Sequence, residues 1–365
     1  MTHSVLVLVL LWSPLCAMGF GMVPPFLSAR RILYLLTSLE SDDWDGILPA
    51  KWAQLHEGLS GVGNHTSPLR MMGFSRKDAA VNGTWATSND GTKFHQVSNV
   101  SAVDLLAWKA FVAEHYVAGG THLVIGTHGE GDFLWFNGVT SDGGKTVHGG
   151  PGPDDGVSFP IERFVKETLA PYQFLSVVLD TCINGELYTA MHFAEVTPYV
   201  VAAEGWMWSA DKALDKSIFS LEGAKAMADP TVTTFEALHT VVRHYTRATD
   251  LADASILHTR SAKAFVDYLT TISPYKTWMV EALEGTKKRP REFSRFCFYT
   301  VRDEDDTWDS MYLLDVGRMM AEAQASPAVK QMWDDTVLLH QGPQNYTKGD
   351  YNFSLTGLSV TVIHL

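Results

Sequence analysis

THLVIGTHGEG, residues 121–131, and FLSVVLDTCINGEL, residues 174–187, each consist of a short apolar strand that runs into a polar, glycine-containing turn. The first strand is followed by Thr127, His128 and Gly129, and the second by Thr181 and Cys182. In open parallel sheets, functional side chains collect where strands end and loops begin. If these two strands are neighbours, we expect His128 and Cys182 to lie at one edge of the sheet.

Helices and apolar strands alternate on both sides of these two segments. We predict strands at 30–36, 121–126, 174–179 and 199–203. We predict helices at 52–59, from a Ser101 cap to Gly119, at 161–169 and at 187–193. Such alternation is typical of a parallel sheet covered by helices on both faces. The predicted fold is therefore α/β, with a mostly parallel central sheet and a mainly helical C-terminal portion.

The sequence pattern divides the chain into three parts. Residues 1–19 hold an apolar run, a proline and small residues, and are predicted to be a signal peptide. Residues 30–215 form the α/β part that carries the His and Cys motifs. Residues 216–365 are predicted to be mainly helical, most clearly at 235–245, 262–272 and 311–325, with a final strand at 355–364 that returns to the sheet. Residues 60–100, rich in Gly, Asn, Ser and Thr, are expected to be an exposed, loop-rich excursion.

Composition excludes several classes of protein. The 365 residues are 46% hydrophobic and only 19% charged, which excludes a disordered chain. A net charge of −13 provides no basic surface for nucleic acid. Three cysteines are too few for a disulfide scaffold. Sequence alone does not predict the oligomeric state.

Two features predict the secretory pathway, with the protein either secreted or retained in an endomembrane compartment. One is the leader, and the other is a set of N-glycosylation sequons at Asn64, Asn82, Asn99, Asn345 and Asn352. No other stretch is apolar over the length that a membrane helix needs, so we expect no membrane span after the leader is removed.

A thiol and an imidazole at successive strand ends suggest nucleophilic catalysis. Only the thiolate attacks well, and a nearby imidazole makes it available at neutral pH. The glycine after His128 leaves room for a substrate carbonyl, and the backbone N–H groups of Gly129 and Cys182 can donate to an oxyanion. The alternative, in which Cys182 is a buried small hydrophobe and His128 a core histidine, stays open on this evidence.

At these residues the sequence resembles the clostripain family of cysteine peptidases, in the clan that includes legumain, caspases and gingipains. The resemblance lies in LVIGTHGEG and LSVVLDTCINGEL, and it continues in VVAAEGWMW, residues 200–208. NVSAVDLLAWKAFVAEHY, upstream, and LTGLSVTVIHL, at the end, are similar to the family's helix before the histidine strand and to its terminal strand. The resemblance implies a caspase-haemoglobinase-like fold and a peptide or protein substrate.

The same resemblance implies a role for each matching residue. Cys182 would be the nucleophile, His128 would protonate the leaving amine, and Gly129 and Cys182 would form the oxyanion hole. Asp180 would lie at the base of the first specificity pocket. Because a buried carboxylate is costly unless it is paired, such a pocket would favour Arg or Lys at P1. Glu204 or Asp211 would add a second acid.

Family relatives cut themselves between the histidine and the cysteine, which implies self-cleavage here. Residues 137–158 contain little that packs a core, and Lys145 is their only basic residue apart from His148, so we predict cleavage after Lys145. An uncut surface loop is the alternative. The chemistry requires no cofactor, but relatives bind calcium. Acids at Asp132, Asp142, Asp154 and Asp155 are available, although none has a recognisable calcium-loop spacing.

Three other functions stay open. Asp-Thr-Cys and HGEGDFLWF also resemble the catalytic subunit of the glycosylphosphatidylinositol-anchor transamidase, but no C-terminal apolar membrane segment is present. A legumain-like peptidase is a related possibility. The third is an inactive secreted glycoprotein that uses the fold for binding. The pair Ile183 and Asn184 departs from the Leu-Met that usually follows the family's nucleophile, and Cys297, between two phenylalanines, is predicted to be a core thiol.

Overall fold

The protein is described as a computed structural model. The described residues are 30–37, 47–60, 67–75, 83–98, 105–130, 133–137, 140–141, 145–146, 156–205, 217–248, 252–271, 297–299, 313–317, 320, 325–342, 346–348, 351–353 and 355–361. The predicted leader, 1–19, lies outside them.

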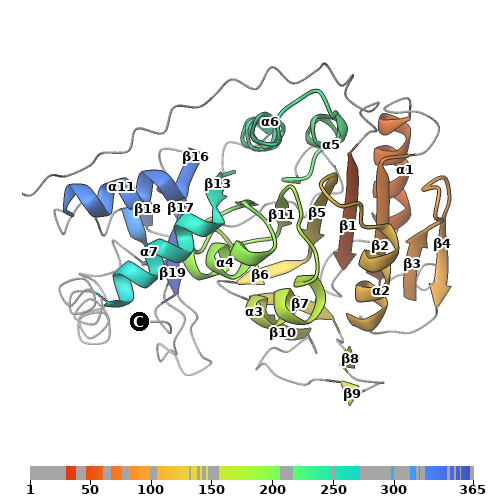
Figure 1. The fold of residues 1–365 in the computed structure, drawn as a ribbon, viewed down its shortest axis with the longest axis horizontal. Coiled ribbons are helices and arrows are strands. Elements are labelled where there is room, and N and C mark those ends of the chain that lie inside the picture. The colour runs from red at the N-terminus through yellow and green to blue at the C-terminus, as the bar shows by residue number, and fades with distance from the viewer. Residues whose placement is uncertain are drawn as a thin grey trace, which may run out of the picture.

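A nine-stranded sheet forms the centre of the molecule (Figure 1). Its order is β16 (Val337–Gln341), β13 (Ala254–His258), β12 (Tyr199–Ala202), β11 (Val177–Asp180), β5 (Thr121–Gly126), β1 (Arg31–Thr37), β2 (Leu69–Ser75), β3 (Gly83–Thr87) and β4 (Phe94–Ser98). The five strands from β12 to β2 are parallel, and the outer pairs are antiparallel. The predicted α/β fold with a mostly parallel centre is confirmed.

Helices cover both faces of this sheet because the central strands are apolar on both sides. In β1, Leu33 and Leu35 belong to one hydrophobic cluster, whereas Ile32, Tyr34 and Leu36 belong to another. The first cluster packs under α2 (Leu105–His115), α3 (Ile161–Phe164) and the π-helical turn η1 (Val165–Leu169). The second packs under α1 (Ile47–Leu59), α5 (Leu221–Ala228) and α6 (Thr234–Ala248).

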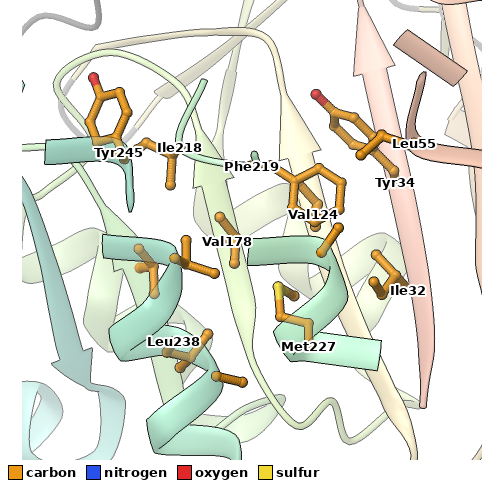
Figure 2. Packing of buried hydrophobic residues seen from close by; sticks show 14 of the residues in the cluster. Ile32, Tyr34, Leu55, Val124, Val178, Ile218, Phe219, Met227, Leu238 and Tyr245 are labelled. Carbon is orange, nitrogen blue, oxygen red and sulfur yellow. The ribbon is translucent and has the colours of Figure 1, made fainter. Parts of the chain in front are cut away.

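Figure 2 shows the second cluster from close by, with Tyr34, Val124 and Val178 from three neighbouring strands facing Met227 and Leu238 of the covering helices. All five side chains are buried. Each fully buried apolar side chain of this size contributes about 1.5–3 kcal/mol to folding.

A third cluster lies beside the sheet and joins the two halves of the chain. It brings together α4 (Leu187–His192), α7 (Thr259–Thr271) and α11 (Pro327–Thr336) with Leu358 near the end of the chain. A 3-10 turn, η2 (Phe193–Glu195), continues α4.

The remaining strands form small sheets. Their bounds are β6 (His128–Glu130), β7 (Phe133–Asn137) and β10 (Gly156–Pro160) in one sheet; β14 (Cys297–Tyr299), β15 (Leu313–Asp315) and β19 (Ser359–Thr361) in a second; and the pairs β17 (Tyr346–Lys348) with β18 (Tyr351–Phe353) and β8 (Thr140–Ser141) with β9 (Lys145–Thr146).

The structure corrects the prediction for residues 60–100. Instead of an exposed excursion, this segment supplies β2, β3 and β4 to the central sheet. Leu69, Met71 and Phe74 are buried, and Arg70 is accommodated in the interior because its guanidinium donates to the carbonyls of Ser67 and Asn89. A polar composition therefore concealed a strand whose charged residue donates hydrogen bonds to three backbone carbonyls.

Three further differences concern the loop after β7 and the end of the chain. Residues predicted as one loop at 137–158 include β8, β9 and the start of β10. The range 311–325, which was predicted to be helical, contains the strand β15, Leu313–Asp315. The final strand pairs with β15 in a small sheet and does not rejoin the nine-stranded one.

The described residues of the C-terminal portion include the helices α5, α6, α7 and α11, and they also contribute β13 and β16 to the central sheet. Among the described helices, none combines the length and the apolar character that crossing a bilayer requires.

Candidate active site

The two motif loops leave the same edge of the sheet. β5 and β11 are adjacent and parallel, and Gly126, the last residue of one, lies opposite Asp180, the last residue of the other. The next residues in the chain are Thr127 and Thr181, followed by His128 and Cys182. The expectation that the two strands are neighbours is therefore confirmed.

The backbones of the two loops are in close contact. His128 and Gly129 form β6, and a Cβ atom built on Gly129 would stand 2.6 Å from the backbone oxygen of Cys182. It would also overlap the side-chain amide of Asn184. Because only a residue without a Cβ allows this approach, Gly129 is the point at which the histidine loop rests on the cysteine loop. The imidazole of His128 lies outside the described part of the structure.

Cys182 is half-buried and belongs to no disulfide. Its side chain packs at the border of the cluster that includes Tyr34 and Val178, so it is directed to the face of the sheet covered by α1, α5 and α6. A thiol at a strand end, packed on one side and not fully enclosed, is placed to react with a ligand at the sheet edge.

The residue after the cysteine has an unusual backbone. Ile183 has a φ angle of 52°, which is costly for a β-branched residue. Its N–H donates to the carbonyl of Gly205 over 2.9 Å, and the N–H of Gly185 donates to the carbonyl of Ala203 over 2.6 Å. These bonds to the segment after β12 hold the cysteine loop in its strained conformation.

Asp253, a residue that sequence analysis did not select, supports the same segment. Its buried carboxylate accepts hydrogen bonds from the backbone N–H groups of Glu204 and Gly205, at 2.8 and 2.9 Å. Burial raises the pKa of Asp253 to about 6, with Asp315 adding to the rise and the two N–H donors opposing it. The only feature of the sequence that could have indicated Asp253 is its place just before an apolar strand. Because acids are common in loops, this feature does not single it out.

Glu204, predicted as a possible second acid near the substrate, makes a contact within the protein. The side chain is fully buried, and its Oε2 atom accepts the backbone N–H of Gly357 over 2.6 Å. This contact anchors the end of the chain to the segment after β12, which is a structural role. The other predicted acid, Asp211, lies outside the described residues.

Asp180 is buried, but its carboxylate is already paired. Its Oδ2 atom accepts hydrogen bonds from Tyr34, Ser217 and the ammonium group of Lys51, the last at 3.1 Å. Its Oδ1 atom accepts the backbone N–H of Ile218 over 3.0 Å. Burial raises the pKa of Asp180, but the charge of Lys51 and these hydrogen bonds outweigh it, so the pKa lies below the usual value. Asp180 is therefore an ionised partner of Lys51.

Several predicted residues are described only in part or not at all. The sequon residues Asn64, Asn82, Asn99 and Asn345 lie outside the described residues, as do Asp132, Asp142, Asp154 and Asp155; Asn352, Lys145 and Cys297 are described as backbone in β18, β9 and β14 only. Within the described ranges, no group of three or more His, Cys, Asp or Glu residues is arranged to hold a metal ion.

Comparison by sequence finds nothing: no family model and no curated protein matches the chain. Comparison of folds finds solved proteases. An inactive zymogen C11 protease from Parabacteroides distasonis is 13% identical, with a TM-score of 0.56, over 92% of this chain and 92% of that one.

A secreted C11 cysteine protease from Bacteroides thetaiotaomicron, in complex with an irreversible peptide inhibitor, is 12% identical with a TM-score of 0.56, over 91% of this chain and 92% of that one. Another structure of a secreted C11 protease from the same organism is 10% identical with the same TM-score, over 91% and 93% of the two chains. At such low identity the likeness concerns the course of the backbone, and it agrees with the family that the motifs resemble. The chain therefore has the fold of the C11, or clostripain-family, cysteine proteases.

Proposed function

We propose that the protein is a cysteine peptidase in which Cys182 is the nucleophile and His128 the proton donor. The observation that carries this proposal is the contact between the two loops, where Gly129 rests against the backbone of Cys182. Two adjacent parallel strands thus deliver a half-buried thiol and a histidine to one edge of a sheet. The C11 protease fold supports the same assignment.

The reaction follows from these groups. The thiolate of Cys182 attacks the scissile carbonyl carbon, and the carbonyl oxygen takes up the negative charge. As the tetrahedral intermediate collapses, the carbon–nitrogen bond breaks and the imidazolium of His128 gives a proton to the leaving amine. Water then hydrolyses the thioester and restores the thiol. The backbone N–H groups of Gly129 and Cys182 are the proposed donors to the oxyanion.

Thiol and imidazole supply both the nucleophile and the proton, so we propose that the chemistry requires no cofactor. Calcium binding stays a prediction of the family resemblance. Secretion is supported by the predicted leader and the sequons in the sequence and, at the level of likeness, by two structures of a C11 protease from Bacteroides thetaiotaomicron that is described as secreted.

Two finer predictions depend on Asp180. Preference for Arg or Lys at P1 requires that its carboxylate be available to a substrate cation, and self-cleavage after Lys145 requires the same preference. In the structure that carboxylate is paired with Lys51. Transamidase, legumain-like peptidase and inactive binding protein are the competing functions, and the first two share the nucleophile Cys182.

Covalent labelling tests the proposal without assuming a P1 preference. The full chain is incubated with peptidyl acyloxymethyl ketones that carry Leu, Gln, Lys or Asp at P1, and the modified residue is located by mass spectrometry. We expect an adduct on Cys182 that disappears in Cys182→Ala and persists in the matched thiol control Cys297→Ser. A folded wild-type protein that no reagent labels would favour the inactive binding protein.

Hydrolysis then separates the enzymes. A peptidase releases the free acid product from a peptide substrate in water. A transamidase joins the acyl group to an added amine such as hydroxylamine in preference to water. Product analysis by mass spectrometry with and without hydroxylamine distinguishes the two.

A further inference from the structure

The ion pair between Lys51 and Asp180 is the feature next to Cys182 that the proposed mechanism does not use. Lys51 comes from α1, and Asp180 ends β11, 129 residues later. Their side chains are only 11% and 4% exposed. The Lys51 ammonium also donates to Ser217 over 3.2 Å and lies 5.1 Å from the centre of the Tyr34 ring. The ion pair is therefore largely buried and is held by several contacts.

The pair lies on the same side of the sheet as the thiol. The side chain of Cys182 packs on the cluster that contains Tyr34 and Val178, and Asp180 binds the hydroxyl of Tyr34 from this side. Figure 2 shows Tyr34 beside Phe219 of this cluster, and their ring centroids are 5.0 Å apart. The hydroxyl of Tyr34 and the backbone N–H of Ile218 both donate to Asp180. Asp180 ends β11 and Cys182 follows two residues later, so a substrate side chain that enters this face beside the thiol would approach the pair.

Charge then decides which side chain is accepted. The carboxylate carries one negative charge, and the ammonium of Lys51 cancels it. The carboxylate of Asp180 accepts four hydrogen bonds from the protein itself, three on Oδ2 and one on Oδ1. A second cation would either repel Lys51 or displace it, and a displaced Lys51 would be buried without its partner.

We propose that Lys51 is the residue that sets P1 specificity, and that by neutralising Asp180 it makes the protein cleave after uncharged residues in place of Arg or Lys. In this proposal Lys51 pairs with Asp180 in place of a basic P1 side chain. This inference rests on the proposed peptidase function and names its substrate class. It follows that the wild-type protein does not cut itself after Lys145.

Two variants of the full chain test the role of the charge. Fluorogenic peptides that differ only at P1, with Leu, Gln, Arg, Lys or Asp, are compared by kcat/KM. Wild type is expected to favour Leu or Gln over Arg and Lys by at least tenfold. Lys51→Met removes the charge at nearly the same length, and we expect the ratio of Arg to Leu cleavage to rise at least tenfold. Lys51→Arg keeps the charge and should keep the wild-type order.

Folding and specificity are separated by controls. Lys51→Met leaves Asp180 with three neutral donors. The double variant Lys51→Met, Asp180→Asn removes both charges, so the double variant should fold and should prefer uncharged P1 residues as wild type does. Lys109→Met, an exposed change on α2, should alter nothing.

Three results would overturn the role of Lys51: a wild-type preference for Arg or Lys at P1, a wild-type preference for Asp, or an unchanged ratio of Arg to Leu cleavage in folded Lys51→Met. If Cys182 is still labelled in these cases, the proposed peptidase function stands. Absence of labelling with every P1 residue would overturn both.

Discussion

Replacing Gly129 by Ala tests the contact between the histidine and cysteine loops. The new Cβ would meet the backbone oxygen of Cys182 at 2.6 Å, and an ordinary van der Waals contact begins at 3.4 Å. The two loops must therefore separate by roughly 0.8 Å. The buried amide of Asn184 would also overlap the methyl group, and moving it would disturb the hydrogen bond that it accepts from Thr181.

The expected cost follows from this displacement. Overpacking of this kind reduces the free energy of unfolding by about 1–3 kcal/mol. A misplacement near 1 Å between reacting groups lowers the rate by about 100-fold. Because Ala keeps the backbone N–H at position 129, this loss would come from displacement of the loops and not from removal of a donor.

The assay measures kcat/KM on a peptide and the rate of Cys182 labelling, with thermal unfolding as the check on folding. Gly120→Ala is the matched control, because its new Cβ would find no atom closer than Val117 Cγ1 at 3.7 Å. If Gly129→Ala and Gly120→Ala both label at the wild-type rate, the two loops do not form one site and the reasoning is wrong.

Two further predictions concern buried acids. Asp180→Ala leaves Lys51 buried without its partner and should lower the free energy of unfolding by about 3–5 kcal/mol in urea titrations, whereas the exposed Asp90→Ala should change it by far less. Because the pKa of Asp180 is lowered by folding, its contribution is present above the unfolded pKa, near 3.8, and is lost as pH falls through the lower folded value. Asp253 has the opposite sign. Its folded pKa of about 6 lies above the unfolded value of 3.8, so folding binds a proton between these limits and stability falls as pH rises from about 4 to about 6, by up to about 3 kcal/mol. In Asp253→Asn, the free energy of unfolding should depend less on pH between about 4 and about 6. A pH dependence equal to that of wild type would contradict the raised pKa of Asp253.

The parts of the fold that could be predicted from sequence are those in which local pattern and tertiary role agree. β5 contains the apolar run Leu123 to Ile125 and β11 the apolar run Val177 to Leu179, and each run ends in glycine or an acid, a pattern typical of a strand buried on both faces. β2 has a different pattern because Arg70 interrupts it, and its acceptors on Ser67 and Asn89 are visible only in three dimensions.

The site divides in the same way. His128 and Cys182 could be selected as candidates because each lies just after a strand, and the topology brings the two strand ends together. The partners of Asp180 and the role of Asp253 could not be found, because Lys51 lies 129 residues from Asp180 and Asp253 lies 49 residues from Glu204. The contact of Glu204 could not be predicted for a related reason: an acid after a strand looks the same in sequence whether it faces a ligand or, as here, the backbone of Gly357.

The central claim is that Cys182 and His128 act as one site. Its most direct test is to measure kcat/KM for peptide hydrolysis by the wild-type chain, His128→Ala and His95→Ala. His95 is an exposed histidine on the edge strand β4 and serves as the control. We predict that His128→Ala loses about 10²- to 10⁴-fold with unchanged thermal unfolding, while His95→Ala keeps wild-type activity. Equal activity of all three proteins would contradict the account.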